Sequence, residues 1–125
     1  MGYGTDGVTF NVLRQANVNR QKEWPGNEHA DVPFRALEVA GEAGELAEKV
    51  KKWLRAERGI KGSTATLADV ASEMGDVLVA LDLLANEMGI NLGEAVREKF
   101  NATSEKYGMR TYIGGDGDWH LKPEA

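Results

Sequence analysis

The chain has 125 residues, of which 42% are hydrophobic and 28% are charged, with a net charge of -5 at pH 7. This length permits one domain with a single core, and the acidic balance argues against a nucleic-acid partner held by a basic surface. No cysteine is present, which excludes a disulfide framework, a thiolate zinc site and a cysteine nucleophile.

The sequence also lacks the signals of a membrane or exported protein. No apolar run approaches the roughly 20 residues that span a bilayer. Residues 1–7, MGYGTDG, have neither the basic nor the apolar region of a signal peptide. We therefore expect a cytoplasmic protein that does not interact with membranes.

Hydrophobic periodicity and Gly or Pro breaks predict four helices joined by short loops. Their expected bounds are Val8 to Glu23, Phe34 to Arg58, Leu67 to Met88, and Leu92 to Tyr107. No segment alternates clearly enough to predict a strand. The expected architecture is an all-α four-helix bundle in a single domain, with a core at about residues 8–111 and a C-terminal tail at 112–125.

Three polar or aromatic positions near the first helix have two interpretations each. Asn17 and Arg20 interrupt an otherwise apolar face, so they are either satisfied polar groups at the edge of the core or groups that face a ligand pocket. Trp24 precedes the Pro25 break and either covers the core or stacks on a nucleobase.

The second and third helices carry the most distinctive pattern, which is three acids at i, i+4 and i+7 in each. These acids are Glu38, Glu42 and Glu45, then Asp69, Glu73 and Asp76. At this spacing each trio lines one side of its helix. Acids on a solvated helix commonly have a cation four residues on, but here only Glu45 does, with Lys49.

Each acid stripe lies beside the apolar arc of its helix rather than opposite to it. Packing the two arcs together would draw the carboxylates to a shared edge, where they repel unless a cation lies between them. Mg²⁺ suits such a place because it prefers oxygen ligands and binds substrate phosphates. The apolar arcs consist of Val39, Ala43, Leu46, Ala47, Val50, Trp53 and Leu54, and of Val70, Met74, Val77, Leu78, Leu81, Leu84 and Met88.

Two alternative roles for the acids fit the sequence less well. If the acids only solvated the helix surfaces, their missing i+4 cations would be unexplained. A ferritin-like di-iron site needs Glu-x-x-His on helices, whereas His29 and His120 both lie in predicted loops. The basic end of the second helix either complements the helix dipole or supplies a phosphate contact, and its Lys52 is nearest to the acid side.

The segments EAGELAE and EMGD resemble the Glu-x-x-Glu and Glu-x-x-Asp pair of the MazG-like nucleoside triphosphate pyrophosphohydrolases, in the all-α pyrophosphatase superfamily. The resemblance extends over about residues 17–111 and includes the EWP entry and the KFNATSEKYG segment. It implies hydrolysis of a nucleoside triphosphate, a deoxynucleotide or non-canonical nucleotide, to the monophosphate and pyrophosphate. Mg²⁺ would be the cofactor, with Mn²⁺ as a substitute.

Carried onto this chain, the resemblance assigns a role to each matching residue. The metal ligands would be Glu42, Glu45, Glu73 and Asp76. The phosphate or sugar contacts would be Lys99 and Asn101, with Lys52 helping to hold the phosphates. The resemblance also implies a homodimer or homotetramer in which several chains complete the bundle.

Gly41 departs from the pattern of many MazG proteins, which carry two adjacent glutamates at the start of the first motif. Glu38 could supply the additional carboxylate, so the general base stays open between Glu38, Glu42 and Glu45. The alternative function is a non-catalytic helical module that binds a nucleotide or a protein. The assignment of Glu38 and Asp69 to the site rests on helix geometry alone, because the family motifs do not include them.

Overall fold

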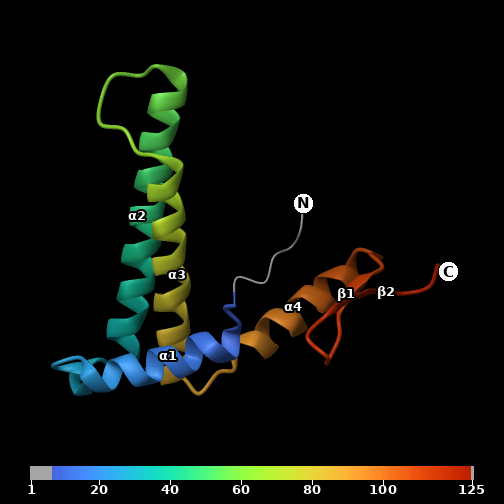
Figure 1. Ribbon diagram of the computed structural model, residues 1–125. Coiled ribbons are helices and arrows are strands. Elements are labelled where there is room, and N and C mark those ends of the chain that lie inside the picture. Colours follow the sequence, from blue (N-terminus) through green and yellow to red (C-terminus); the bar gives the residue numbers. More distant parts are fainter. Residues whose placement is uncertain (1–6, 125) are drawn as a thin grey trace. The chain divides into compact units, whose positions relative to one another are not determined.

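The computed structural model describes residues 7–124, which divide after Gly89 into two compact units. We call the part up to Gly89 the N-terminal unit and the part from Ile90 the C-terminal unit. The expected set of four α-helices is confirmed (Figure 1). The N-terminal unit contains α1 (Phe10–Glu23), the short 3₁₀ helix η1 (Asn27–His29), α2 (Val32–Arg58) and α3 (Leu67–Glu87).

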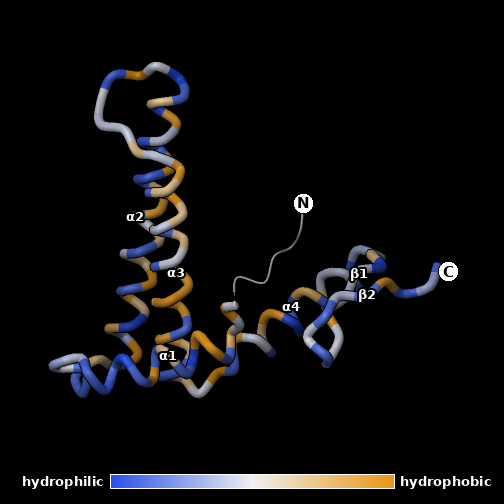
Figure 2. The backbone as a smooth tube through the Cα atoms, in the orientation of Figure 1, coloured by the Kyte–Doolittle hydropathy of each residue, from blue (hydrophilic) through white to orange (hydrophobic). Residues whose placement is uncertain are grey.

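The two longest helices, α2 and α3, form an antiparallel pair that is the frame of the N-terminal unit (Figure 1). Asp31 caps the start of α2 by accepting a hydrogen bond from Phe34 N, and Gly59 ends the helix in the left-handed region at φ 65°. Apolar residues recur along both helices (Figure 2). The pairing brings the two predicted acid stripes into one unit.

The start of α3 is fixed by a capping box between Thr66 and Asp69. Thr66 Oγ1 accepts from Asp69 N at 3.1 Å, and the Asp69 carboxylate accepts from Thr66 N at 2.8 Å. The hydrogen bonds from Thr66 hold the pKa of Asp69 below its usual value. Asp69 is thus occupied at the helix terminus.

Helix α1 is attached to α3 by buried polar contacts around Asp82, which is 1% exposed. Arg14 donates to the Asp82 carboxylate through Nε at 3.1 Å and forms an ion pair with it through Nη2 at 3.1 Å. Asn17 Nδ2 donates to Asp82 Oδ2 at 3.0 Å and to the Val79 carbonyl at 3.3 Å. Because each polar group has a partner, this buried charge can be accommodated.

The core of the N-terminal unit is smaller than the apolar arcs predict. Its buried apolar residues in the described chain are Ala65, Val70, Ala80, Leu83 and Ala85. Three members of the apolar arc of α3, Met74, Leu78 and Met88, are 52%, 41% and 54% exposed, so a single copy of the chain leaves part of this arc uncovered. Within the N-terminal unit, α1 and α2 cover only part of the apolar circumference of α3.

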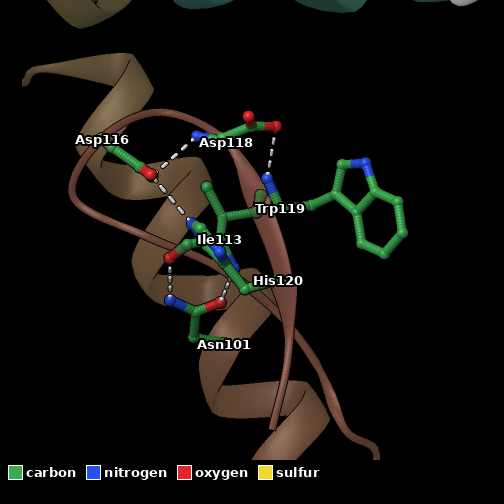
Figure 3. Close-up of polar contacts among 6 residues, drawn as sticks. All are labelled: Asn101, Ile113, Asp116, Asp118, Trp119 and His120. Carbon is green, nitrogen blue, oxygen red and sulfur yellow. Dashed lines mark hydrogen bonds and ion pairs between the residues drawn. The ribbon is translucent and has the colours of Figure 1, made fainter.

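The C-terminal unit contains α4 (Leu92–Lys106) and an antiparallel hairpin of β1 (Thr111–Ile113) and β2 (Trp119–Leu121). Asn101 on α4 contacts both backbone groups of Ile113, donating to its carbonyl at 2.8 Å and accepting from its N–H at 2.7 Å (Figure 3). Asp116 contacts His120 across the turn. Part of the segment from residue 111 onward therefore forms a pair of short strands, which the sequence pattern did not predict.

No helix within residues 7–124 combines the length and the apolar character that crossing a bilayer requires.

Candidate metal centre and adjoining cavity

Three of the predicted ligands converge in the N-terminal unit. Glu42 extends from α2, and Glu73 and Asp76 lie one turn apart on the facing side of α3. One oxygen of each carboxylate lies within 4.8 Å of the others. Opposite ligands of an octahedral Mg²⁺ ion are about 4 Å apart, at about 2 Å from the metal. The three oxygens are therefore close to the spacing that a small divalent cation requires.

The cluster contains buried oxygens without a partner. Glu42 Oε2 and Glu73 Oε2 are both buried and receive no hydrogen bond within the described chain. Burial raises the pKa of Glu42, and the negative charges of Glu45, Asp76 and Glu73 raise it further. Such an arrangement favours a proton or a cation among the carboxylates, and its all-oxygen ligands suit Mg²⁺ or Mn²⁺.

The remaining predicted acids occupy different places around this cluster. Glu45 lies one turn after Glu42 and is exposed, outside the group of three converging carboxylates. Glu38 lies one turn before Glu42 and pairs with Arg35 at 2.9 Å. Asp69 serves the capping box described above. The six acids of the two stripes thus separate into three converging carboxylates, two flanking carboxylates and a helix cap.

A cavity of about 440 Å³ opens beside the cluster, entirely within the N-terminal unit. Glu38, Glu42 and Asp76 line it at the carboxylate cluster, and Trp24 and Phe34 contribute aromatic surface. Its volume falls in the range of small-molecule sites. Acidic groups and aromatic rings in one cavity suit a ligand that combines a metal-bound anion with a planar ring.

The wall formed by α1, η1 and α2 is organised around a buried arginine. Arg35 is 4% exposed and contacts Glu38, Gln21 and Asn27 through its terminal nitrogens. All four residues line the cavity. Arg35, Gln21 and Asn27 are not among the residues predicted from the sequence. The i, i+3 spacing of Arg35 and Glu38 is a signal for Arg35 only, and such pairs are common on solvated helices. No pattern in the sequence indicates Gln21 or Asn27.

The predicted substrate contacts are distributed over both units. Trp24 lines the cavity, whereas Asn17 is not among its lining residues and is bonded to Asp82 and Val79. Lys52 is half-buried on α2, also outside the cavity lining. Lys99 and Asn101 belong to the C-terminal unit, where Lys99 is exposed and the Asn101 amide is engaged by Ile113. Their contacts with a nucleotide stay predictions.

Comparison with known proteins agrees with this arrangement. Residues 35–111 match the family described as the MazG nucleotide pyrophosphohydrolase domain. The chain is also similar to the Gene 37 protein of Mycobacterium phage L5, with 33% identity over 85 residues that cover 68% of this chain and 73% of the phage protein. The family match includes the three converging carboxylates and spans more than half of the chain. This protein therefore belongs to the MazG nucleotide pyrophosphohydrolase domain family.

Proposed function

We propose that this chain hydrolyses a nucleoside triphosphate to the monophosphate and pyrophosphate in the N-terminal cavity. The observation that carries the proposal is the convergence of Glu42, Glu73 and Asp76, with two buried, unpartnered oxygens, at the side of a nucleotide-sized cavity. In the reaction the oxygen of a water molecule bonds to the α-phosphorus. The bond from that phosphorus to the bridging oxygen breaks, and pyrophosphate leaves with the electron pair.

The three carboxylates would hold a Mg²⁺ ion, for which Mn²⁺ could substitute. When bound there, the ion would neutralise phosphate charge and lower the pKa of a coordinated water. The contribution of the chain itself is to keep three ligands close together before the ion arrives. That preorganisation is favoured by the rigid pairing of α2 with α3.

We infer that Glu45 is the general base. Glu42 is part of the cluster, and the carboxylate of Glu38 is held by Arg35 at 2.9 Å. Glu45 is exposed and lies close enough to the cluster for its charge to raise the pKa of Glu42. A carboxylate in that position can accept the proton that the attacking water loses. Lys52 would neutralise part of the phosphate charge from its position further along α2.

We further propose that copies of the chain associate into a homodimer or homotetramer and complete a four-helix bundle. In the N-terminal unit Leu37 is 73% exposed, and Met74 and Leu78 on α3 are open to solvent. Exposed apolar surface of this kind favours association. A deoxynucleotide or non-canonical nucleotide as substrate, and a cytoplasmic location, remain predictions from the sequence.

The test is pyrophosphate release from a panel of canonical and modified nucleoside triphosphates in the presence of Mg²⁺. Turnover should be lost in Glu42→Gln and in Glu73→Gln, with helicity retained by circular dichroism. Glu57→Gln, on the exposed end of α2, is the matched control and should keep full activity. A folded wild-type protein that turns over none of the triphosphates would instead support a non-catalytic binding module.

A further inference from the structure

The guanidinium group of Arg35 determines how two amide side chains are oriented in the cavity wall. Arg35 Nη2 donates to Gln21 Oε1 at 3.1 Å and to Asn27 Oδ1 at 2.8 Å. A guanidinium has hydrogen-bond donors only. The atoms that face Arg35 must therefore be the two amide oxygens, which removes the ambiguity of amide orientation at these positions.

With both oxygens fixed on Arg35, the amide nitrogens must point elsewhere. Within residues 7–124 neither Gln21 Nε2 nor Asn27 Nδ2 donates a hydrogen bond, although both side chains are half-buried. Both residues line the same cavity as Trp24. The wall therefore carries two N–H₂ groups that are oriented in advance and available to a ligand.

A second constraint holds Arg35 itself in place. Its Nη1 donates to Glu38 at 2.9 Å, so the carboxylate neutralises a cation that is 4% exposed. Two hydrogen bonds to neutral amides and one ion pair use both terminal nitrogens of the side chain. Because the guanidinium group is planar and both of its terminal nitrogens are hydrogen-bonded, its rotation would break several contacts at once.

We propose that Arg35 is a positioning residue for nucleobase recognition, which fixes Gln21 and Asn27 so that their N–H₂ groups donate to acceptor atoms on the base edge. The bases that qualify present carbonyl oxygens or ring nitrogens along one edge. This inference rests on the proposed function only in that the cavity holds a nucleotide. It assigns base selection to the α1–η1–α2 wall and phosphate binding to the carboxylate cluster.

The experiment measures equilibrium binding by calorimetry in the presence of Mg²⁺. The ligands are deoxynucleoside triphosphates of all four bases with an imido group between the α- and β-phosphorus, and inorganic tripolyphosphate, which has no base. The wild-type protein should bind at least one nucleotide more tightly than tripolyphosphate. Its affinities for the four bases should differ.

Two substitutions remove the donors but keep the contacts with Arg35. Gln21→Glu and Asn27→Asp replace each N–H₂ by an oxygen, and the new carboxylate still accepts from the guanidinium. Each substitution should lower the affinity for the preferred nucleotide about tenfold. One hydrogen bond to the base is lost, and the new carboxylate oxygen faces an acceptor atom of the base. Tripolyphosphate affinity should stay unchanged, which separates this effect from general repulsion of the phosphates.

Gln15→Glu and Asn19→Asp are the matched controls. They make the same change of charge at exposed positions of α1 outside the cavity lining, and they should bind all ligands as the wild-type protein does. Arg35→Lys keeps the positive charge but replaces the two terminal nitrogens of the guanidinium group by a single ammonium group. It should bring the affinities for the four bases closer together while the affinity for tripolyphosphate is retained.

The outcomes distinguish this inference from the proposed hydrolysis. Wild-type nucleotide affinity in both Gln21→Glu and Asn27→Asp would overturn the inference and leave Arg35 as a structural link between η1 and α2. A loss of nucleotide affinity in these variants, with tripolyphosphate affinity unchanged, supports the inference whether or not the protein releases pyrophosphate. The absence of pyrophosphate release would overturn only the proposed hydrolysis. Turnover combined with equal affinity for nucleotides and tripolyphosphate would overturn the inference alone.

Discussion

Glu42 on α2 and Glu73 on α3 each bury one carboxylate oxygen, Oε2, that has no hydrogen-bond partner within the described chain. Buried acceptors are normally satisfied, because removing them from water without compensation costs free energy. Two such atoms from neighbouring helices, beside the carboxylate of Asp76, concentrate negative charge in one place. The fold therefore tolerates a local electrostatic cost that a cation would offset.

Mg²⁺ should stabilise the wild-type protein against heat. A cation that binds only the folded state adds about 2.7 kcal/mol to the free energy of unfolding at a concentration of about one hundred times its Kd. Thermal denaturation with EDTA and with saturating Mg²⁺ measures this effect. We expect Glu73→Gln to abolish the difference, whereas Glu87→Gln, at the end of α3 and outside the carboxylate cluster, should preserve it.

The pH dependence of stability should reveal the raised pKa of Glu42. Burial and the adjacent carboxylates raise this pKa above its ordinary value of 4.5. The folded state therefore binds this proton more tightly than the unfolded state does. The corresponding stability is fully present below pH 4.5 and is lost as the pH rises through the folded-state pKa.

The measurement is the melting temperature as a function of pH in EDTA, for the wild-type protein and for Glu42→Gln. The difference between the two curves isolates the contribution of Glu42. It should change in the window above pH 4.5, with the wild-type protein losing stability relative to the variant as pH rises. A difference that does not vary with pH across this window would count against the raised pKa.

Asp82 should be essential for holding α1 on α3. Asp82→Ala leaves Arg14 and Asn17 without their shared acceptor and should lower the free energy of unfolding by about 3–5 kcal/mol, as expected when a buried ion pair loses one partner. Urea denaturation followed by circular dichroism measures this loss. Asp118→Ala, at an exposed position in the C-terminal unit, is the control, and an equal loss there would contradict the specific role of Asp82.

Asp69 should affect the stability of α3 and not its metal binding. Thr66→Ala removes the other half of the capping box and should cost about 1 kcal/mol of unfolding free energy. Asp69→Asn should also lower the melting temperature at neutral pH, since the hydrogen bonds from Thr66 favour the ionised carboxylate. Calorimetric titration with Mg²⁺ should give the wild-type Kd for both variants. A weakened Mg²⁺ affinity in Asp69→Asn would instead place this acid in the metal centre.

Trp24 should contribute to base binding through its ring. It lies in the lining of the cavity and is 60% exposed, so its face is available for stacking. Trp24→Ala should weaken nucleotide binding by about 1–3 kcal/mol, the range for one stacked base, without changing the affinity for tripolyphosphate. Trp24→Phe should recover part of the loss. An equal loss of affinity for nucleotide and for tripolyphosphate would show that Trp24 maintains the shape of the cavity and does not stack on the base.

The alignment of the acids could be predicted from sequence because the helical repeat places each trio on one side of its helix. Which of the six acids converge depends on how α2 packs on α3, and the repeat does not specify this. Glu73 and Asp76 are three residues apart, so they share a helix face, and Glu42 occupies the corresponding stripe of α2. The Arg35 network could not be predicted in the same way, because Gln21, Asn27 and Arg35 meet only after the chain turns back at Pro25 and Gly26. Their chemistry depends on tertiary folding rather than on a local period.

The hairpin and the exposed apolar positions were missed for different physical reasons. Strands of three residues are too short to display an alternating pattern. Met74 and Leu78 have the periodicity of core residues, but periodicity identifies an apolar face without saying how much of that face one chain can cover. A shared surface between copies of the chain produces the same pattern as an internal core.

The contact between Asn101 and Ile113 has a consequence for how the hairpin behaves toward other molecules. A strand at the border of a sheet exposes backbone groups that can recruit a strand from a second molecule. The amide of Asn101 satisfies both the N–H and the carbonyl of Ile113, in the manner of an adjacent peptide group (Figure 3). A single side chain thus protects this end of β1 from unwanted edge-to-edge aggregation.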